Sequence, residues 1–269
     1  MVCYPQERLW RLGRECGIPM QGLLNLVVFE PTRMVYVLTP KCGSSSVVAA
    51  FATMSGLEGL EMGRTFAWKA NADGRLAKLG LIMRQLEPGD VRGLRDRYPD
   101  YRFLGNIRDP YTRAVSNYFS KINRYSKHFD RTTYVLGKLG HLFQGPGTWS
   151  DGRVANGFMQ RRVGFEDMLA GLTRHGIDFD SHFTQQSDLL QLSHMRYDRL
   201  LRLETLDEVF PEAMAEFGLP AEMLARLGAV PHGNSSRYRG NEAALLTDAT
   251  RATIRSLYPD DFAKLGYPA

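Results

Sequence analysis

The sequence predicts an α/β fold in which a central, mostly parallel sheet is flanked by helices. Two apolar runs, residues 34–38 and 101–107, resemble strands buried on both faces, as central strands of a parallel sheet are. Each run leads through a polar loop into a helical pattern, and this alternation typifies a sheet with helices on both faces. No Pro-, Gly- or Ser-rich linker divides the 269 residues, so we predict a single domain, residues 1–269.

The first elements are predicted to be a hairpin followed by a helix. Residues 23–30 and 34–38 are strand-like runs separated by a short turn, and the second run is expected at the centre of the sheet. Residues 45–54 predict a helix that follows directly. Its sheet-facing residues are expected to be Val47, Val48, Phe51 and Ala52.

The remaining helices and strands are also predicted from the periodicity of apolar residues. Helices are predicted around residues 75–85, 90–97, 109–124, 165–174, 206–217 and 241–257, and a further strand over residues 197–203. Residues 126–160 are rich in glycine and aromatic residues and have few periodic apolar positions. This segment is therefore expected to be an insertion or a lid.

A loop of small polar residues follows the first central strand and reads Pro-Lys-Cys-Gly-Ser-Ser-Ser over residues 40–46. Gly43 allows close approach of the backbone to a ligand, and the serines stand where free N–H groups of a helix attract an anion. Lys41 adds a full positive charge. In the common nucleotide triphosphatase loop, G-x-x-x-x-G-K-[ST], the lysine follows the second glycine. Here the lysine precedes the glycine, which disfavours an ordinary ATPase or kinase.

A second candidate anion site follows the second central strand. Arg108 precedes Asp109-Pro110, a good N-cap and a good first helical residue, and Ser116 lies eight residues beyond the arginine. Ser116 is then about two turns into the helix. Arg108 and Ser116 can therefore meet on one anion only if the chain before the helix folds over that face.

The two motifs, in this order, resemble the 5′-phosphosulfate and 3′-phosphate motifs of sulfotransferases that use 3′-phosphoadenosine 5′-phosphosulfate. The resemblance implies the P-loop-like sulfotransferase fold, this nucleotide as donor, a leaving-group role for Lys41 and no metal. It also implies a late loop over the adenosine or the 3′-phosphate, although the residues there can equally form a polar surface turn. The residues expected to bind the donor are Lys41, Cys42, Gly43, Ser44, Ser45, Ser46, Arg108, Ser116, Ser235, Ser236 and Arg237.

Weaker similarities point to the carbohydrate branch of this family, which includes the chondroitin and dermatan sulfotransferases. Residues 181–190 are similar to a His-Trp-x-Pro-Gln segment of that branch, with Phe183 and Gln185 in place of tryptophan and proline. Glu204 at the end of the 197–203 run and the C-terminal Asp-Phe of residues 261–262 also match. This resemblance implies an acceptor hydroxyl on a saccharide or glycolipid; a small metabolite, a lipid or a peptide tyrosine stays open.

The general base is not fixed by the motifs. Many sulfotransferases place a histidine or glutamate between them, but residues 47–107 contain no histidine, and their glutamates are Glu58, Glu61 and Glu87. His182, in the His-Trp-like segment, has a near-neutral ordinary pKa and ranks first, with Glu61 second. Each also has a plain structural reading, His182 as a hydrogen-bonded histidine and Glu61 as a solvated loop residue.

Charge and cysteine content limit the partners and the compartment. The formal charge of +5 suits an anionic ligand, but 34 basic and 29 acidic residues are dispersed, so nucleic acid is not implied. Cys3, Cys16 and Cys42 have neither metal-site nor disulfide spacing, which favours a reducing compartment. There is no signal-peptide core and no run of about 20 apolar residues, so a cytoplasmic enzyme without a membrane span is expected. Cys42 is either a loop residue or a thiol activated by its surroundings.

Two other functions stay open. A P-loop kinase using ATP would need a lysine after the second glycine of the loop and an acidic metal ligand at a strand end. A non-catalytic module that binds a nucleotide or polyanion would need no base, and the missing histidine between the motifs is compatible with it.

Overall fold

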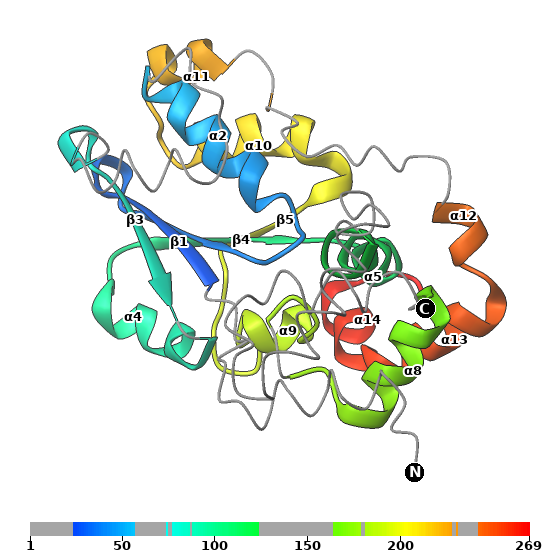
Figure 1. Cartoon of the computed structure of the whole chain (residues 1–269). Helices are drawn as coiled ribbons and strands as arrows, with labels where there is room; N and C mark the ends of the chain where they lie inside the picture. Colours follow the sequence, from blue (N-terminus) through cyan, green and yellow to red (C-terminus); the bar gives the residue numbers. More distant parts are fainter. Residues whose placement is uncertain are drawn as a thin grey trace, which may run out of the picture.

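The computed structural model describes residues 24–56, 74, 77–86, 88–123, 164–178, 181–227, 230 and 242–269. These residues form a five-stranded sheet with the strand order β3-β1-β2-β4-β5 (Figure 1). The strands are β1 (Leu24–Phe29), β2 (Met34–Leu38), β3 (Leu81–Leu86), β4 (Arg102–Ile107) and β5 (Arg199–Arg202).

The sheet is mixed, and most of its strands run in one direction. β2 pairs in parallel with β4, and β4 in parallel with β5. β1 is antiparallel to both of its neighbours, β2 and β3. The predicted hairpin, the central place of the second run and the mostly parallel sheet are therefore confirmed.

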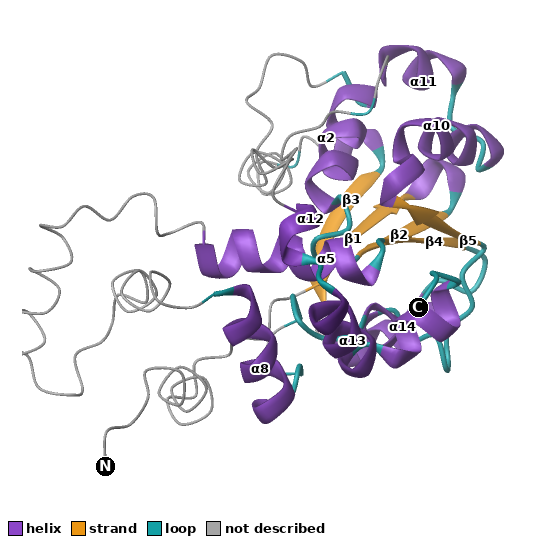
Figure 2. Cartoon of the chain, turned by 90° about the vertical axis from the view of Figure 1, so that its right-hand side faces the viewer, coloured by secondary structure: helices purple, strands orange, loops and turns teal. Residues whose placement is uncertain are grey.

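Both faces of the sheet are buried, as the continuous apolar runs predict. Along β2, Met34, Tyr36 and Leu38 contribute to one core cluster, while Val35 and Val37 contribute to the other. This alternation follows from the two-residue period of a strand. The fold is thus α/β with three layers, helix, sheet and helix (Figure 2).

The helices divide between the two faces. One face is covered by α2 (Ser44–Met54), α10 (Leu206–Glu216) and α11 (Ala221–Leu227). The other carries α4 (Leu94–Arg97), α5 (Pro110–Asn117), α8 (Phe165–His175), α9 (Gln186–Leu189), α13 (Asp248–Leu257) and α14 (Pro259–Leu265), with α12 (Glu242–Leu245) at its margin. Short turns are η1 (Glu30–Thr32), η2 (Ala77–Leu79), η3 (Pro88–Gly93) and η6 (Leu203–Thr205), with a π-helical turn η4 (Tyr118–Asn123).

An aromatic trio fixes α2 against the sheet. The ring centroids of Phe51 in α2 and Tyr36 in β2 are 6.2 Å apart, and Phe210 of α10 lies 5.8 Å from Phe51. Each such pair contributes about 0.5–1.5 kcal/mol beyond the burial of its area. The N-terminus of α2, where the first candidate loop ends, is thereby held on a rigid base.

The predicted helix over residues 75–85 is wrong in its second half. Residues 77–79 form the turn η2, but β3 begins at Leu81 and pairs along its whole length with β1. Pairing with a free sheet edge overrides a weak local preference for helix. The helix predicted over residues 90–97 is confirmed only over α4 (Leu94–Arg97), because the residues before it belong to the turn η3.

The C-terminal region also differs from the prediction. The helix expected over residues 241–257 is two helices, because Thr247 accepts a hydrogen bond from the Thr250 N–H and starts α13 anew. One more helix, α14, begins at Pro259, a favourable first helical residue. The helices predicted at 45–54, 165–174 and 206–217 are confirmed as α2, α8 and α10.

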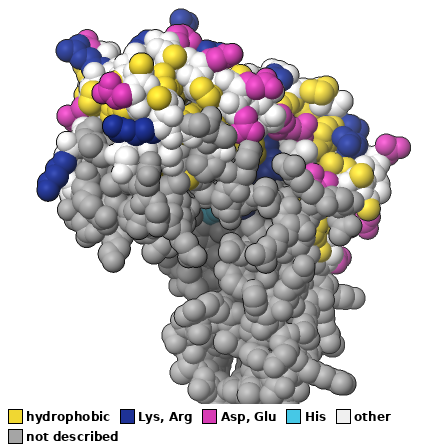
Figure 3. Space-filling model, turned by 90° about the horizontal axis from the view of Figure 1, so that it is seen from above, with side chains coloured by type: hydrophobic (Ala, Val, Ile, Leu, Met, Phe, Trp, Pro, Cys, Tyr) yellow, Lys and Arg dark blue, Asp and Glu magenta, His cyan; other side chains and the backbone are white. Residues whose placement is uncertain are grey.

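Several predicted regions lie outside the described residues, including the whole 126–160 segment expected to be an insertion or a lid. Within the described ranges, no helix combines the length and apolar character that a membrane span requires. On the face above α2, α10 and α11, basic and acidic side chains are intermixed over the described surface (Figure 3).

Candidate functional site

The two motifs meet at one edge of the sheet. Because β2, β4 and β5 are parallel neighbours, their carboxyl ends lie together, and the segments that follow them are residues 39–43, 108–109 and 203–205. In open α/β sheets this edge is where ligands bind. The site is therefore built from three loops carried by three adjacent strands.

The first loop is held against β4 by one side chain of that strand. The Thr39 N–H donates to Oδ1 of Asn106 at 2.9 Å, and Nδ2 of the same asparagine donates to the Cys42 carbonyl. Asn106 is fully buried. Sequence reasoning missed this residue, because it stands inside an apolar run whose other members are core residues.

The loop turns sharply into α2. Lys41 and Gly43 both have positive φ, 66° and 89°. Gly43 is the N-cap of α2, and a Cβ added there would come within 2.7 Å of Cδ1 of Leu203. Glycine therefore serves both the left-handed backbone and the close approach of the β5 loop. The first N–H groups of α2 are left without acceptors inside the helix and can bind an anion.

The three serines of the loop differ in what they can offer a phosphate. The Ser44 hydroxyl donates to the Thr39 carbonyl at 2.7 Å, so its proton serves the loop itself. Ser45 and Ser46 are partly exposed in the first turn of α2. We expect phosphate binding through backbone amides and the Ser45 and Ser46 hydroxyls more than through the Ser44 hydroxyl.

Arg108 bridges the two motifs. Its Nη1 donates to the carbonyl oxygen of Lys41 at 3.3 Å, and its Nε donates to Oγ1 of Thr112 at 2.9 Å. The side chain thus folds over the first turn of α5, where Asp109 caps the helix by accepting the Thr112 N–H. Ser116 is one turn beyond Thr112, and residues four apart lie on the same helix face. The Arg108 side chain is therefore bonded on the helix face that also carries Ser116, and a shared anion stays a prediction.

Glu204 supports the second motif from the end of β5. Its Oε1 accepts the Asp109 N–H at 2.8 Å, and its Oε2 accepts the Tyr267 hydroxyl at 3.0 Å. Burial and the nearby Glu204 carboxylate raise the pKa of Tyr267, so this hydroxyl stays a donor. The acidic residue identified at the strand end therefore anchors the start of α5 and ties it to the C-terminal segment.

A buried arginine connects the first loop to the segment that carries His182. Arg113 of α5 is 2% exposed and donates to three backbone carbonyls, those of Pro40, Ser181 and Thr184. Nδ2 of Asn117 donates to the His182 carbonyl. The backbone of His182 is thus held beside α5, which is the helix that bears Ser116. Arg113 gave no signal in the sequence, because arginine on an amphipathic helix is normally exposed.

Other predicted site residues lie outside the described residues. These are Glu61, Ser235, Ser236 and Arg237. Among the residues that the structure describes, no group of three or more His, Cys, Asp or Glu side chains could hold a metal ion. The roles of Glu61, Ser235, Ser236 and Arg237 stay predictions.

Cys42 is a buried thiol rather than an activated one. It is fully buried, and Sγ donates to Oε1 of Gln186 at 3.0 Å. Burial raises the pKa of the Cys42 thiol to about 12, against the opposite effect of the nearby Arg113 and Arg108 charges. The structure therefore favours a packing and hydrogen-bonding role over nucleophilic chemistry.

This burial predicts a pH dependence of stability. The folded protein keeps the Cys42 thiol protonated up to about pH 12, whereas in the unfolded chain it ionises near pH 8.5. A raised folded pKa stabilises the folded state below the unfolded pKa, and this contribution is lost as pH rises. Relative to Cys42→Ser, the wild type should lose about 1.4 kcal/mol of unfolding free energy per pH unit above about pH 9. Urea unfolding of both proteins between about pH 8 and 10 measures this; parallel pH profiles would contradict it.

A family model described as the sulfotransferase family matches residues 24–268, which is most of the chain and includes both motifs. No curated protein and no solved structure matched.

Proposed function

Since the chain belongs to the sulfotransferase family, we propose that it transfers a sulfonyl group from 3′-phosphoadenosine 5′-phosphosulfate to an acceptor hydroxyl. Sulfotransfer is the activity of the family; the donor and the acceptor are the proposal. One observation carries it: Arg108 of the second motif donates to the Lys41 carbonyl of the first. One ligand that carries phosphates on both the 3′ and the 5′ oxygen of a ribose can therefore contact both motifs.

The proposed chemistry requires in-line positioning and charge stabilisation. The acceptor oxygen attacks sulfur, the bond between sulfur and the bridging oxygen breaks, and the electron pair stays on the departing 5′-phosphate. The Lys41 ammonium and the amides at the N-terminus of α2 stabilise that charge. Arg108 and Ser116 hold the 3′-phosphate. The hydroxyl proton passes to a base, for which His182 is the first candidate and Glu61 the second.

For the acceptor we propose a hydroxyl of a saccharide or glycoconjugate. The support is the similarity of residues 181–190 to the carbohydrate branch, in which the glutamine of the His-Trp-x-Pro-Gln pattern corresponds to Gln186. The buried contacts of Gln186 with both motifs give that glutamine a structural reason to be present. A cytoplasmic location is proposed from the cysteine content alone.

Calorimetric titration with adenosine 3′,5′-bisphosphate, ADP and AMP, without added metal, tests the donor. We expect tight binding of the bisphosphate and binding of AMP weaker by about 10- to 100-fold, because the charge-assisted bonds to the 3′-phosphate are missing. Equal binding of all three would refute the donor assignment, and a preference for ADP would favour the kinase alternative. Bisphosphate binding without transfer to any of a broad panel of hydroxyl acceptors would favour the non-catalytic module.

A further inference from the structure

A buried side-chain amide links the two donor motifs from a third segment of the chain. Gln186, the first residue of α9, is 0% exposed. Its Oε1 accepts the Cys42 thiol proton at 3.0 Å and the Arg108 N–H at 2.8 Å. Its Nε2 donates to the Arg108 carbonyl at 2.8 Å and to Oδ2 of Asp261 at 3.1 Å. Both acceptor sites and both donor sites of the amide are therefore occupied.

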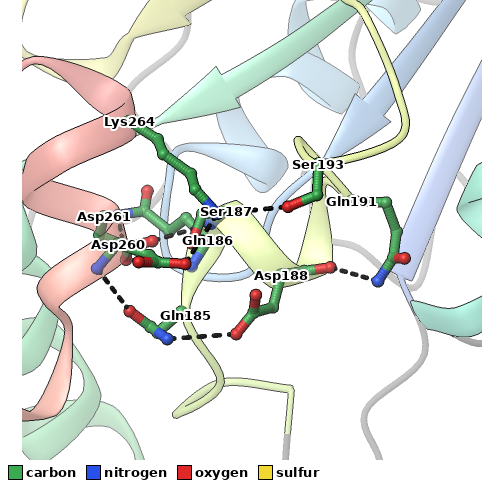
Figure 4. Close-up of polar contacts among 9 residues, drawn as sticks. All are labelled: Gln185, Gln186, Ser187, Asp188, Gln191, Ser193, Asp260, Asp261 and Lys264. Carbon is green, nitrogen blue, oxygen red and sulfur yellow. Dashed lines mark hydrogen bonds and ion pairs between the residues drawn. The ribbon is translucent and has the colours of Figure 1, made fainter.

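Asp261 of α14 sets the orientation of this amide. It is 0% exposed, and its carboxylate also accepts the backbone N–H groups of Gln186 at 3.0 Å and Ser187 at 2.8 Å (Figure 4). The Asp261 side-chain oxygens accept three N–H groups in all, and one of them is the Nε2 of Gln186, so Nε2 faces this residue. Oε1 then faces the other way, toward the Cys42 thiol and the Arg108 N–H.

The Gln186 amide binds the backbone of Arg108, from which the guanidinium side chain extends. It bonds to both the N–H and the C=O of that one residue, much as a neighbouring strand would. The same oxygen bonds Cys42, which precedes the N-cap glycine of the phosphate loop. Movement of Gln186 would therefore change the position of the Arg108 backbone relative to the loop.

We propose that Gln186, oriented by Asp261, is a positioning residue that sets the spacing between the 5′-phosphate and 3′-phosphate sites. It thereby determines the preference for nucleotides phosphorylated at both positions. The inference rests on the proposed function, since it assumes that the two motifs bind one nucleotide. A purely structural role would lower stability and weaken all nucleotides equally, whereas a positioning role changes their ratio.

The test compares two adjacent glutamines. Gln186→Met keeps the volume and removes the four bonds. Gln185→Met is the matched control, because the Gln185 side chain joins the same two helices through Asp188 at 3.2 Å and the Asp260 N–H at 3.0 Å. Calorimetry gives the ratio of dissociation constants for AMP and adenosine 3′,5′-bisphosphate, and thermal unfolding gives the stability of each variant.

Gln186→Met should lower this ratio about tenfold, with Gln185→Met within about twofold of the wild type. A wild-type ratio in folded Gln186→Met, or an equal fall in both variants, would overturn the proposal. If Gln186→Met does not fold, the Asp261→Asn variant is measured in its place, because this substitution releases the Gln186 amide without removing it. A lowered ratio of dissociation constants in Asp261→Asn supports the proposal, and an unchanged ratio overturns the proposal. A wild-type protein without preference for the bisphosphate would refute the proposed function itself, and this inference with it.

Discussion

Replacing Lys41 by alanine is expected to lower the turnover of sulfonyl transfer by about 10²- to 10³-fold. The reason is that negative charge develops on the bridging oxygen as the bond to sulfur breaks, and a preorganised cation there acts mainly in the transition state. Binding of the product adenosine 3′,5′-bisphosphate should weaken far less, by about tenfold, because other groups also hold its phosphate. Single-turnover rates and calorimetry separate the two effects.

The backbone makes alanine the suitable replacement at this position. Lys41 has φ 66°, a left-handed conformation that costs any non-glycine residue some energy. Alanine carries the same cost as lysine, so the loop should keep its shape, whereas glycine would both relieve the strain and loosen the loop. Lys41→Arg, which keeps the charge on a longer side chain, should retain part of the turnover. A Lys41→Ala enzyme with more than about a tenth of wild-type turnover would remove the leaving-group role.

The parts of the fold that the sequence predicts correctly are those with strong local signals. β2 is an unbroken apolar run and β4 a mostly apolar one, and α5 begins with the Asp-Pro pair that the sequence identifies as an N-cap and a first helical residue. β3 was missed because its residues, with Arg84 and Gln85 among them, carry no clear strand pattern. Its conformation comes from pairing with β1, which no local window contains.

The candidate site divides in the same way. Both motifs can be identified from the sequence, because the residues of each motif lie close together in the chain. The residues that hold the motifs in place cannot be identified in this way. Asn106, Arg113 and Gln186 bond to partners that are 67, 73 and 144 residues away in the chain. Each is a polar residue whose burial and hydrogen bonds depend on the assembled fold, so its supporting role cannot be predicted from a local stretch of the sequence.

Replacing Arg108 by alanine is expected to weaken binding of adenosine 3′,5′-bisphosphate by about 10- to 100-fold while leaving AMP within about twofold. A guanidinium has five N–H donors. Contacts with Thr112 at 2.9 Å and with the Lys41 carbonyl at 3.3 Å engage Nε and Nη1, which fixes the plane of the group. We expect the remaining N–H groups of the fork to bind the ligand, and in the proposed complex only a 3′-phosphate supplies an anion on the face of α5 that carries Ser116. Calorimetry with both nucleotides measures the effect.

Two further variants distinguish recognition of the 3′-phosphate from support of the loop. Arg108→Lys keeps a point charge but cannot form the fork, so the bisphosphate should bind with intermediate affinity. Thr112→Val keeps the guanidinium and removes the hydroxyl that holds Nε, so it should cost the bisphosphate less than Arg108→Ala. If Arg108→Ala weakened AMP as much as the bisphosphate, the contact with Lys41 would be the function of Arg108, and the 3′-phosphate would have to be bound elsewhere. If only the bisphosphate is affected, the arginine that joins the two loops also reads the group that distinguishes this donor from ordinary adenine nucleotides.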